Sequence, residues 1–334
     1  MLIPSLALWG VLEESSAVEF CLREPYPALF PHVLKQKGGL FLNRKLETAI
    51  AYFFTLNGAF VIFILVGIFA LLLSSSFAAW QDVGFISFLT DRVWNPSGFV
   101  ASHFGIFTKI VGTLMVTAGA MLFAVPLGIA TAAYLAEVAS SWEREIVKPV
   151  IELLAAVPSV VLGFFGIVVF SPLLARIFNL PNGLNALNGS ILLGLMSLPT
   201  IISIAEDALT AVPKEYKEAS LALGATRWQT LSRVIIPAAG SGVTAAIMLG
   251  IGRSLGETMT VIMATGNALQ FPSDFFSSVR TMTATIAIEL GEVPADTTHY
   301  YSLFAIGFVL FSMTFLVSLL ADIFLHRAGE VKKL

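Results

Sequence analysis

Long apolar runs separated by short polar segments dominate this chain from residue 49 onward. A helix needs about 20 apolar residues to cross the roughly 30 Å hydrocarbon core of a bilayer. Runs of this length recur along the sequence, so the pattern predicts an all-α, polytopic transmembrane bundle with about six spans. The predicted spans cover residues 49–73, 110–136, 150–174, 189–205, 238–269 and 302–325.

The composition agrees with a membrane protein and excludes several other classes. Hydrophobic residues make up 57% of the chain and charged residues only 12%, whereas soluble domains are about one quarter charged. The net charge of -3 provides no basic surface for nucleic acid. Cys21 is the single cysteine, and the four histidines show no ligand spacing, so neither an internal disulfide nor a metal site is expected.

Basic residues between the spans predict the orientation, because Lys and Arg are retained on the cytoplasmic side. The side that contains both termini has most of them, and the opposite side has only Arg92, Arg176 and Arg280. Both termini are therefore predicted to be cytoplasmic. The resulting division is a cytoplasmic leader at 1–48, a first transmembrane helix at 49–73, an extracytoplasmic loop at 74–105, a core at 106–325 with a cytoplasmic loop at 213–237, and a cytoplasmic tail at 326–334.

The cytoplasmic loop at 213–237 is predicted to form two short helices. Pro213 suits a first helical turn, and Gly224 can end that helix in the left-handed region. Thr226 and Gln229 have the spacing of a capping box that starts a second helix. Charged side chains decorate both helices, which suits docking on a polar partner surface.

This loop resembles the EAA loop of bacterial ABC importer permeases. That pattern is Glu-Ala-Ala, three residues, Gly, nine residues and Ile-x-Leu-Pro, and here it reads Glu218-Ala219-Ser220, then Gly224, then Val234-Ile235-Ile236-Pro237. Ser220, Val234 and Ile236 depart conservatively from it. In that family the loop lies in a groove of the ATPase and transmits its closure to the spans. The resemblance therefore implies an ATPase-coupling role for Glu218, Ala219, Ser220, Gly224, Arg227 and Pro237.

The chain contains no Walker A pattern, which is the glycine-rich loop that holds the phosphates of ATP. ATP is therefore expected to be used by a separate subunit. This chain is predicted to be a transporter subunit without an ATPase site of its own and without a bound cofactor or metal.

Two charges lie inside the predicted fifth span. Arg253 and Glu257 are four residues apart, so a continuous helix would place them on one face. A charge in the membrane costs about 2.5 to 3.5 kcal/mol or more, so both are expected to face protein or a wet cavity. Arg can give phosphate two parallel hydrogen bonds, and Glu257 could accept the proton of monohydrogen phosphate. Both are predicted to line the substrate pathway; the alternative is that they only neutralise each other.

Further segments resemble the C-type permease of the phosphate-specific (Pst) importers. They are Phe88-Leu89, Trp94-Asn95-Pro96, Pro126 to Glu137, Ala156 to Gly163, Gly252 to Met259 and Thr265-Gly266-Asn267. The resemblance implies a multi-pass subunit of the bacterial inner membrane that passes phosphate inward by alternating access. It also implies a homologous second permease, two copies of an ABC ATPase and an extracytoplasmic phosphate-binding protein as partners.

Other interpretations remain at the level of sequence. The cargo could be another oxyanion, such as molybdate or sulfate, or an amino acid. Gly252-Arg-Ser254-Leu-Gly256 fits the Gly-x-Ser-x-Gly pattern of a serine hydrolase, but no histidine lies inside a predicted span to activate the serine. A non-transporting scaffold or sensor would explain the spans but neither the EAA-like loop nor Arg253.

Overall fold

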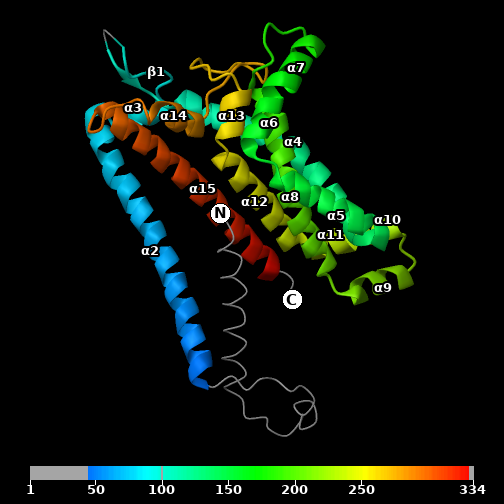
Figure 1. The fold of residues 1–334 in the computed structure, drawn as a ribbon. Helices are drawn as coiled ribbons and strands as arrows, with labels where there is room; N and C mark the ends of the chain where they lie inside the picture. Colours follow the sequence, from blue (N-terminus) through cyan, green and yellow to red (C-terminus); the bar gives the residue numbers. More distant parts are fainter. Residues whose placement is uncertain (1–43, 99–100, 331–334) are drawn as a thin grey trace. The chain divides into compact units, whose positions relative to one another are not determined.

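The computed structural model describes residues 44–98 and 101–330 (Figure 1). Most of the predicted leader, including Cys21, and the last four residues of the predicted tail lie outside this part. The chain divides after Ala70 into two units. The first part of α2 (Arg44–Val83) belongs to the first unit, and all other elements belong to the second.

The second unit is almost entirely helical, with one short antiparallel hairpin in which Trp94 pairs with Phe104. In chain order its elements are α3 (Phe85–Thr90), β1 (Trp94–Asn95), β2 (His103–Phe104), α4 (Phe107–Glu137), α5 (Ser141–Ala156), α6 (Ser159–Phe165), the π-helical η1 (Gly166–Phe170), α7 (Ser171–Ile177), α8 (Ala186–Thr210), α9 (Lys214–Ala222), α10 (Arg227–Thr230), the π-helical η2 (Leu231–Ile235), α11 (Ile236–Ala238), α12 (Gly240–Gly256), α13 (Met259–Ala264), α14 (Met282–Glu289) and α15 (Thr298–Glu330).

Helices α4, α8 and α12 pack against one another at the centre of this unit (Figure 1). Small residues allow the close approach: a Cβ added at Gly128 of α4 or at Gly250 of α12 would come within 2.7 Å of the side chain of Ile201 in α8. The hairpin and α14 lie at one end of the unit, and α9 and α10 lie at the other. The long central helices therefore connect two chemically different ends.

The number of spans agrees with the prediction. Within the described residues, five helices are long and apolar enough to cross a membrane. A sixth span is obtained if Arg227–Ala238 and Gly240–Gly256, which bend by 72° at their junction, are taken as one crossing. The all-α polytopic architecture is therefore confirmed.

Three of the predicted spans differ most from the structure. Helix α2 continues ten residues beyond the predicted first span, to Val83. The predicted third span is divided at Pro158, because the residue before a proline avoids helical geometry and Val157 is extended. The predicted fifth span ends at Gly256, not at residue 269; glycine is about 1 kcal/mol less favourable than alanine inside a helix, and both Gly252 and Gly256 lie in its last turns.

Candidate functional site

Arg253 lies in the last turn of α12, close to where the helix breaks off. Its Nε atom is buried and has no hydrogen-bond partner among the described residues. No described carboxylate lies within salt-bridge distance of its guanidinium either. A cation at a helix C-terminus is favoured by the helix dipole, but its hydrogen-bonding capacity is left unused. Arg253 can therefore donate to a ligand that reaches this point of the bundle.

Glu257 is not part of the helix that carries Arg253, so the continuous helix that the prediction assumed is not present. The helix ends at Gly256, and Glu257 follows it in an extended conformation. Its carboxylate Oε1 accepts a hydrogen bond of 3.2 Å from the backbone N–H of Thr260 in the first turn of α13. The two charges therefore do not neutralise each other along one helix, as the alternative interpretation required.

Hydrogen bonds that involve α6, α13 and α14 hold the break after α12 in place. The hydroxyl of Thr283 in α14 donates to the backbone carbonyl of Glu257 at 2.9 Å. The hydroxyl of Thr260 donates to the carbonyl of Ser159 at 3.0 Å, which connects α13 to α6. The irregular backbone around Glu257 is thus fixed by neighbouring helices, as backbone at membrane depth must be.

The arrangement around Ser254 is not that of an activated nucleophile. Its buried hydroxyl shares a hydrogen bond of 2.8 Å with the hydroxyl of Ser197 in α8. In the described part of the chain, no histidine hydrogen-bonds to Ser254, whereas a serine nucleophile needs a base within reach. Ser254 therefore connects α12 to α8.

The loop at 213–237, which we call the coupling loop, has the predicted local structure. Helices α9 and α10 are joined at Gly224, whose φ of 86° is left-handed. Thr226 and Gln229 form both hydrogen bonds of the capping box, at 2.9 and 3.3 Å. Glu218 and Ala219 on α9, like Arg227 on α10, are exposed. Leu223 and Trp228 are 90% and 73% exposed, so the loop presents apolar and charged groups together.

Polar side chains connect the coupling loop to the bundle and its two helices to each other. Lys217 of α9 forms an ion pair with Glu137, the last residue of α4. Ser220 of α9 shares a hydrogen bond of 3.0 Å with Thr230 of α10. The EAA pattern has alanine at the position of Ser220, and alanine could not form this hydrogen bond.

Two further polar contacts surround this end of α4. The guanidinium of Arg144 in α5 donates to the carbonyl oxygens of Leu135 and Ala136, which have no partner inside the helix. Lys148 of α5 lies 2.8 Å from the carboxylate of Glu206 in α8. The hydrogen bond to Glu206 raises the pKa of Lys148 above its ordinary value. No local spacing in the sequence indicates these pairs, because their members are far apart along the chain.

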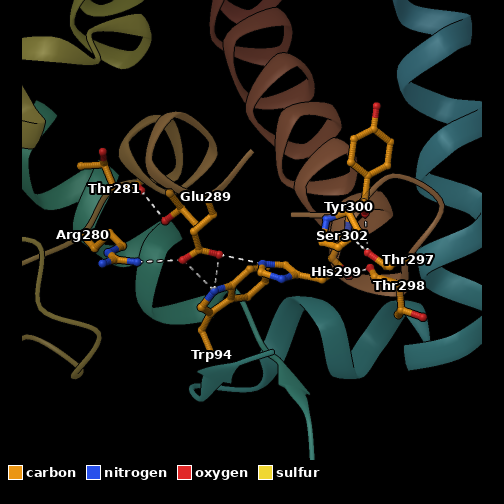
Figure 2. Close-up of polar contacts among 11 residues, drawn as sticks. Trp94, Arg280, Thr281, Glu289, Thr297, Thr298, His299, Tyr300 and Ser302 are labelled. Carbon is orange, nitrogen blue, oxygen red and sulfur yellow. Dashed lines mark hydrogen bonds and ion pairs between the residues drawn. The ribbon is translucent and has the colours of Figure 1, made fainter. Parts of the chain in front are cut away.

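At the opposite end of the unit, one carboxylate gathers side chains from several elements (Figure 2). Glu289, the last residue of α14, accepts hydrogen bonds from Arg280 at 2.8 Å and from the indole N–H of Trp94 at 3.0 Å. His299 of α15 lies 2.8 Å from the same carboxylate through Nε2. All of these side chains are at least four-fifths buried.

Lys109 of α4 extends this group. Its ammonium lies 4.5 Å from the ring centroid of Trp94, its side chain is 1% exposed, and Nζ has no hydrogen-bond partner among the described residues. We call Trp94, Lys109, Arg280, Glu289 and His299 the Glu289 cluster. This cluster was not predicted from the sequence. Two features indicate it in retrospect: Glu289 ends a short apolar helix, and Lys109 lies at the start of a span.

Comparison with known proteins gives the family. Residues 124–329 match the family described as binding-protein-dependent transport system inner membrane component. The phosphate transport system permease protein PstC of Mesorhizobium japonicum is 36% identical over 317 residues, which cover 89% of this chain and 95% of that protein. The probable ABC transporter permease protein YqgH of Bacillus subtilis is 40% identical over 235 residues, covering 70% and 76%.

Solved structures support the same fold. A chain of a bacterial ABC transporter involved in the import of the acidic polysaccharide alginate superimposes with a TM-score of 0.55, covering 85% of this chain and 99% of that chain. Its sequence identity is 17%, so this likeness concerns the fold alone.

Proposed function

This chain belongs to the family of binding-protein-dependent transport system inner membrane components, and we propose that it forms half of the pore of an ATP-driven importer of inorganic phosphate. The chain carries the spans and the coupling loop, a separate ATPase docks on that loop, and an extracytoplasmic binding protein delivers the anion. A homologous permease completes the pore, and both termini are cytoplasmic. With this orientation, the Glu289 cluster is extracytoplasmic.

The observation that carries the choice of an oxyanion is the unpaired guanidinium of Arg253. Burying a hydrogen-bonding group without a partner costs about 1–3 kcal/mol, and its Nε atom has none among the described residues. A planar guanidinium matches a tetrahedral oxyanion with two parallel hydrogen bonds. The similarity to phosphate permeases such as that of Mesorhizobium japonicum makes phosphate the first choice among oxyanions.

Glu257 contributes selectivity in this proposal. One of its carboxylate oxygens caps α13, and the carboxylate remains close to the break after α12. A carboxylate repels a fully ionised anion such as sulfate but can accept the proton of monohydrogen phosphate. A site with an unsatisfied acceptor rejects an analogue that lacks the matching donor.

The test is ATP-dependent uptake of labelled phosphate into proteoliposomes that contain the complete complex, with unlabelled sulfate, molybdate and amino acids as competitors. We expect competition by phosphate analogues only. Transport of another solute would show that the protein is an importer but that phosphate is not its cargo. An intact complex without any ATP-linked transport would favour a non-transporting scaffold.

Arg253→Ala is expected to abolish uptake while the complex still assembles, because the oxyanion loses its hydrogen-bond donor. Arg253→Lys should retain part of the activity, since a charge remains without the planar fork. Arg176→Ala, which removes an exposed arginine at the end of α7, is the matched control and should transport normally. Normal uptake by well-assembled Arg253→Ala would contradict the role of Arg253.

Glu257→Gln should transport better than Glu257→Lys, because the amide still accepts the hydrogen bond from Thr260 and adds no charge. Sulfate should inhibit phosphate uptake more strongly in the Glu257→Gln variant than in the parent protein. Equal uptake and equal selectivity in both variants would show that Glu257 has only a structural role.

A further inference from the structure

The ion pair between Glu137 and Lys217 connects two elements that have very different surroundings. Glu137 ends α4, which packs at the centre of the unit, and its side chain is 15% exposed. Lys217 lies on α9, a helix of nine residues that buries none of its own residues. Helix α9 is therefore weakly anchored by apolar packing, and its charged contact with α4 is a direct side-chain connection to the bundle.

The surroundings of this pair leave room for movement. Glu137 and Lys217 line a hollow of about 340 Å³ together with apolar residues of the coupling loop, among them Leu221 and Trp228. A helix that borders a hollow is not held by close packing on that side. A partner that displaces α9 therefore moves Lys217, and the ion pair resists separation from Glu137.

Helix α4 extends from this pair to the other end of the unit. It is continuous over 31 residues, which corresponds to about 46 Å at 1.5 Å per residue. Near its other end, the hydroxyl of Thr113 accepts a hydrogen bond of 3.0 Å from the backbone N–H of Met282, the first residue of α14. The next residue, Thr283, holds the backbone carbonyl of Glu257. Helix α4 and the start of α14 thus connect Lys217 with the segment that contains Glu257.

We propose that the Glu137–Lys217 ion pair transmits displacement of the coupling loop to α4, and through α14 to the break that follows Arg253. Glu137 and Lys217 are positioning residues in this proposal, because they touch neither the substrate nor ATP. The proposal rests on the proposed function, since it assumes that an ATPase moves the loop. It assigns a role to two residues outside the EAA-like pattern.

The test measures ATP hydrolysis and phosphate uptake separately in the reconstituted complex. Glu137→Gln and Lys217→Gln should each lower the phosphate transported per ATP hydrolysed by about tenfold, within the range of typical coupling energies. ATP hydrolysis by the assembled complex should stay close to that of the parent. The charge exchange, Glu137→Lys with Lys217→Glu, should recover most of the ratio, whereas a merely structural pair would change both activities in parallel.

The control pair is Lys148 and Glu206, which also form an ion pair across two helices at this end. Lys148→Gln should leave the transport ratio unchanged. An equal loss of the ratio in Lys148→Gln, or no loss in Glu137→Gln and Lys217→Gln, would overturn the proposal.

A second readout does not depend on the cargo. Gly256, where an added Cβ meets open space, is replaced by Cys in a Cys21→Ser background, and its labelling rate is measured with and without ATP. We expect ATP to change this rate in the parent, not in Glu137→Gln, and again in the charge exchange. If the labelling rates follow this pattern but phosphate is not transported, the proposed cargo is wrong, whereas the proposed role of the Glu137–Lys217 ion pair is supported. If ATP changes the rate equally in all variants, or in none, the transmission is disproved.

Discussion

The two ends of the second unit use charged residues in opposite ways. In the Glu289 cluster, one buried carboxylate is shared by Trp94, Arg280 and His299, which come from separate segments. At the coupling-loop end, Lys148 and Lys217 each pair with a different acid, and these lysine side chains are 38% and 42% exposed. Shared burial fixes several elements in one arrangement, whereas each separate half-exposed pair ties only two elements to each other.

This contrast corresponds to what a transporter of this family needs. Replacing one member of a buried charge network leaves the remaining charges unpaired at high cost, so the cluster should be rigid. Half-exposed ion pairs contribute only about 0–1 kcal/mol to stability, so each can join two elements without fixing the whole end in one arrangement. We therefore expect stability to depend on the Glu289 cluster and coupling to depend on the Glu137–Lys217 pair at the other end.

The largest effect on stability is expected for Glu289→Gln. This change keeps the shape of the side chain but leaves the largely buried guanidinium of Arg280 without its counter-charge. Breaking a buried pair in this way costs about 3–5 kcal/mol of unfolding free energy. Thermal unfolding of the purified complex measures it, and Glu292→Gln, an exposed acid in the following turn, is the control. Equal melting temperatures of the two variants would show that the Glu289 cluster does not stabilise its end of the unit.

A smaller effect is expected for Trp94→Phe. Phenylalanine keeps an aromatic ring beside Phe104 and Lys109 but loses the N–H donor to Glu289. A hydrogen bond to a charged group contributes about 1.5–3 kcal/mol to the free energy of unfolding. Because Arg280 and His299 still contact the carboxylate, the loss should lie at the lower end of this range. Unfolding measurements on Trp94→Phe, Glu289→Gln and the double variant test this, because members of one network should not be additive. Full additivity would show that Trp94 and Glu289 act independently.

The smallest effect is expected for Lys148→Gln. Because the lysine side chain is more than one third exposed, solvent screening limits its contribution to less than about 1 kcal/mol. The hydrogen bond to Glu206 raises the pKa of Lys148, so the folded state binds this proton more tightly than the unfolded state. The stabilisation is therefore complete below the ordinary lysine pKa of 10.5 and is lost as the pH rises through the raised value.

Unfolding of Lys148→Gln and of the parent at neutral pH and at a pH above the raised pKa of Lys148 measures this contribution. The difference between the two proteins should disappear in alkali. A difference that is larger than that of Trp94→Phe, or that is independent of pH, would contradict a half-exposed ion pair at this end.

Local sequence patterns predicted the parts of this protein that depend on local physics. Six apolar runs correspond to five long helices and one bent pair among the described residues, because burial in lipid requires length and hydrophobicity in each segment separately. Gly224 and the Thr226–Gln229 capping box predicted the two helices of the coupling loop, since turn and capping chemistry acts over a few residues. Arg253 was also recognisable from the sequence, because a charged residue inside an apolar span is unusual.

Tertiary structure decided the contacts between distant positions. Trp94 and Glu289 are 195 positions apart, and Glu137 and Lys217 are 80 apart. The sequence pattern placed Arg253 and Glu257 in one continuous helix, but that helix ends at Gly256. A hydrogen bond from α13 to α6 and one from α14 to Glu257 stabilise the broken backbone there. The sequence by itself determined which segments enter the membrane and where the coupling loop turns, because each depends on neighbouring residues. Which charges meet was decided by packing, since the free energy of a buried charge depends on partners that only the folded chain brings near.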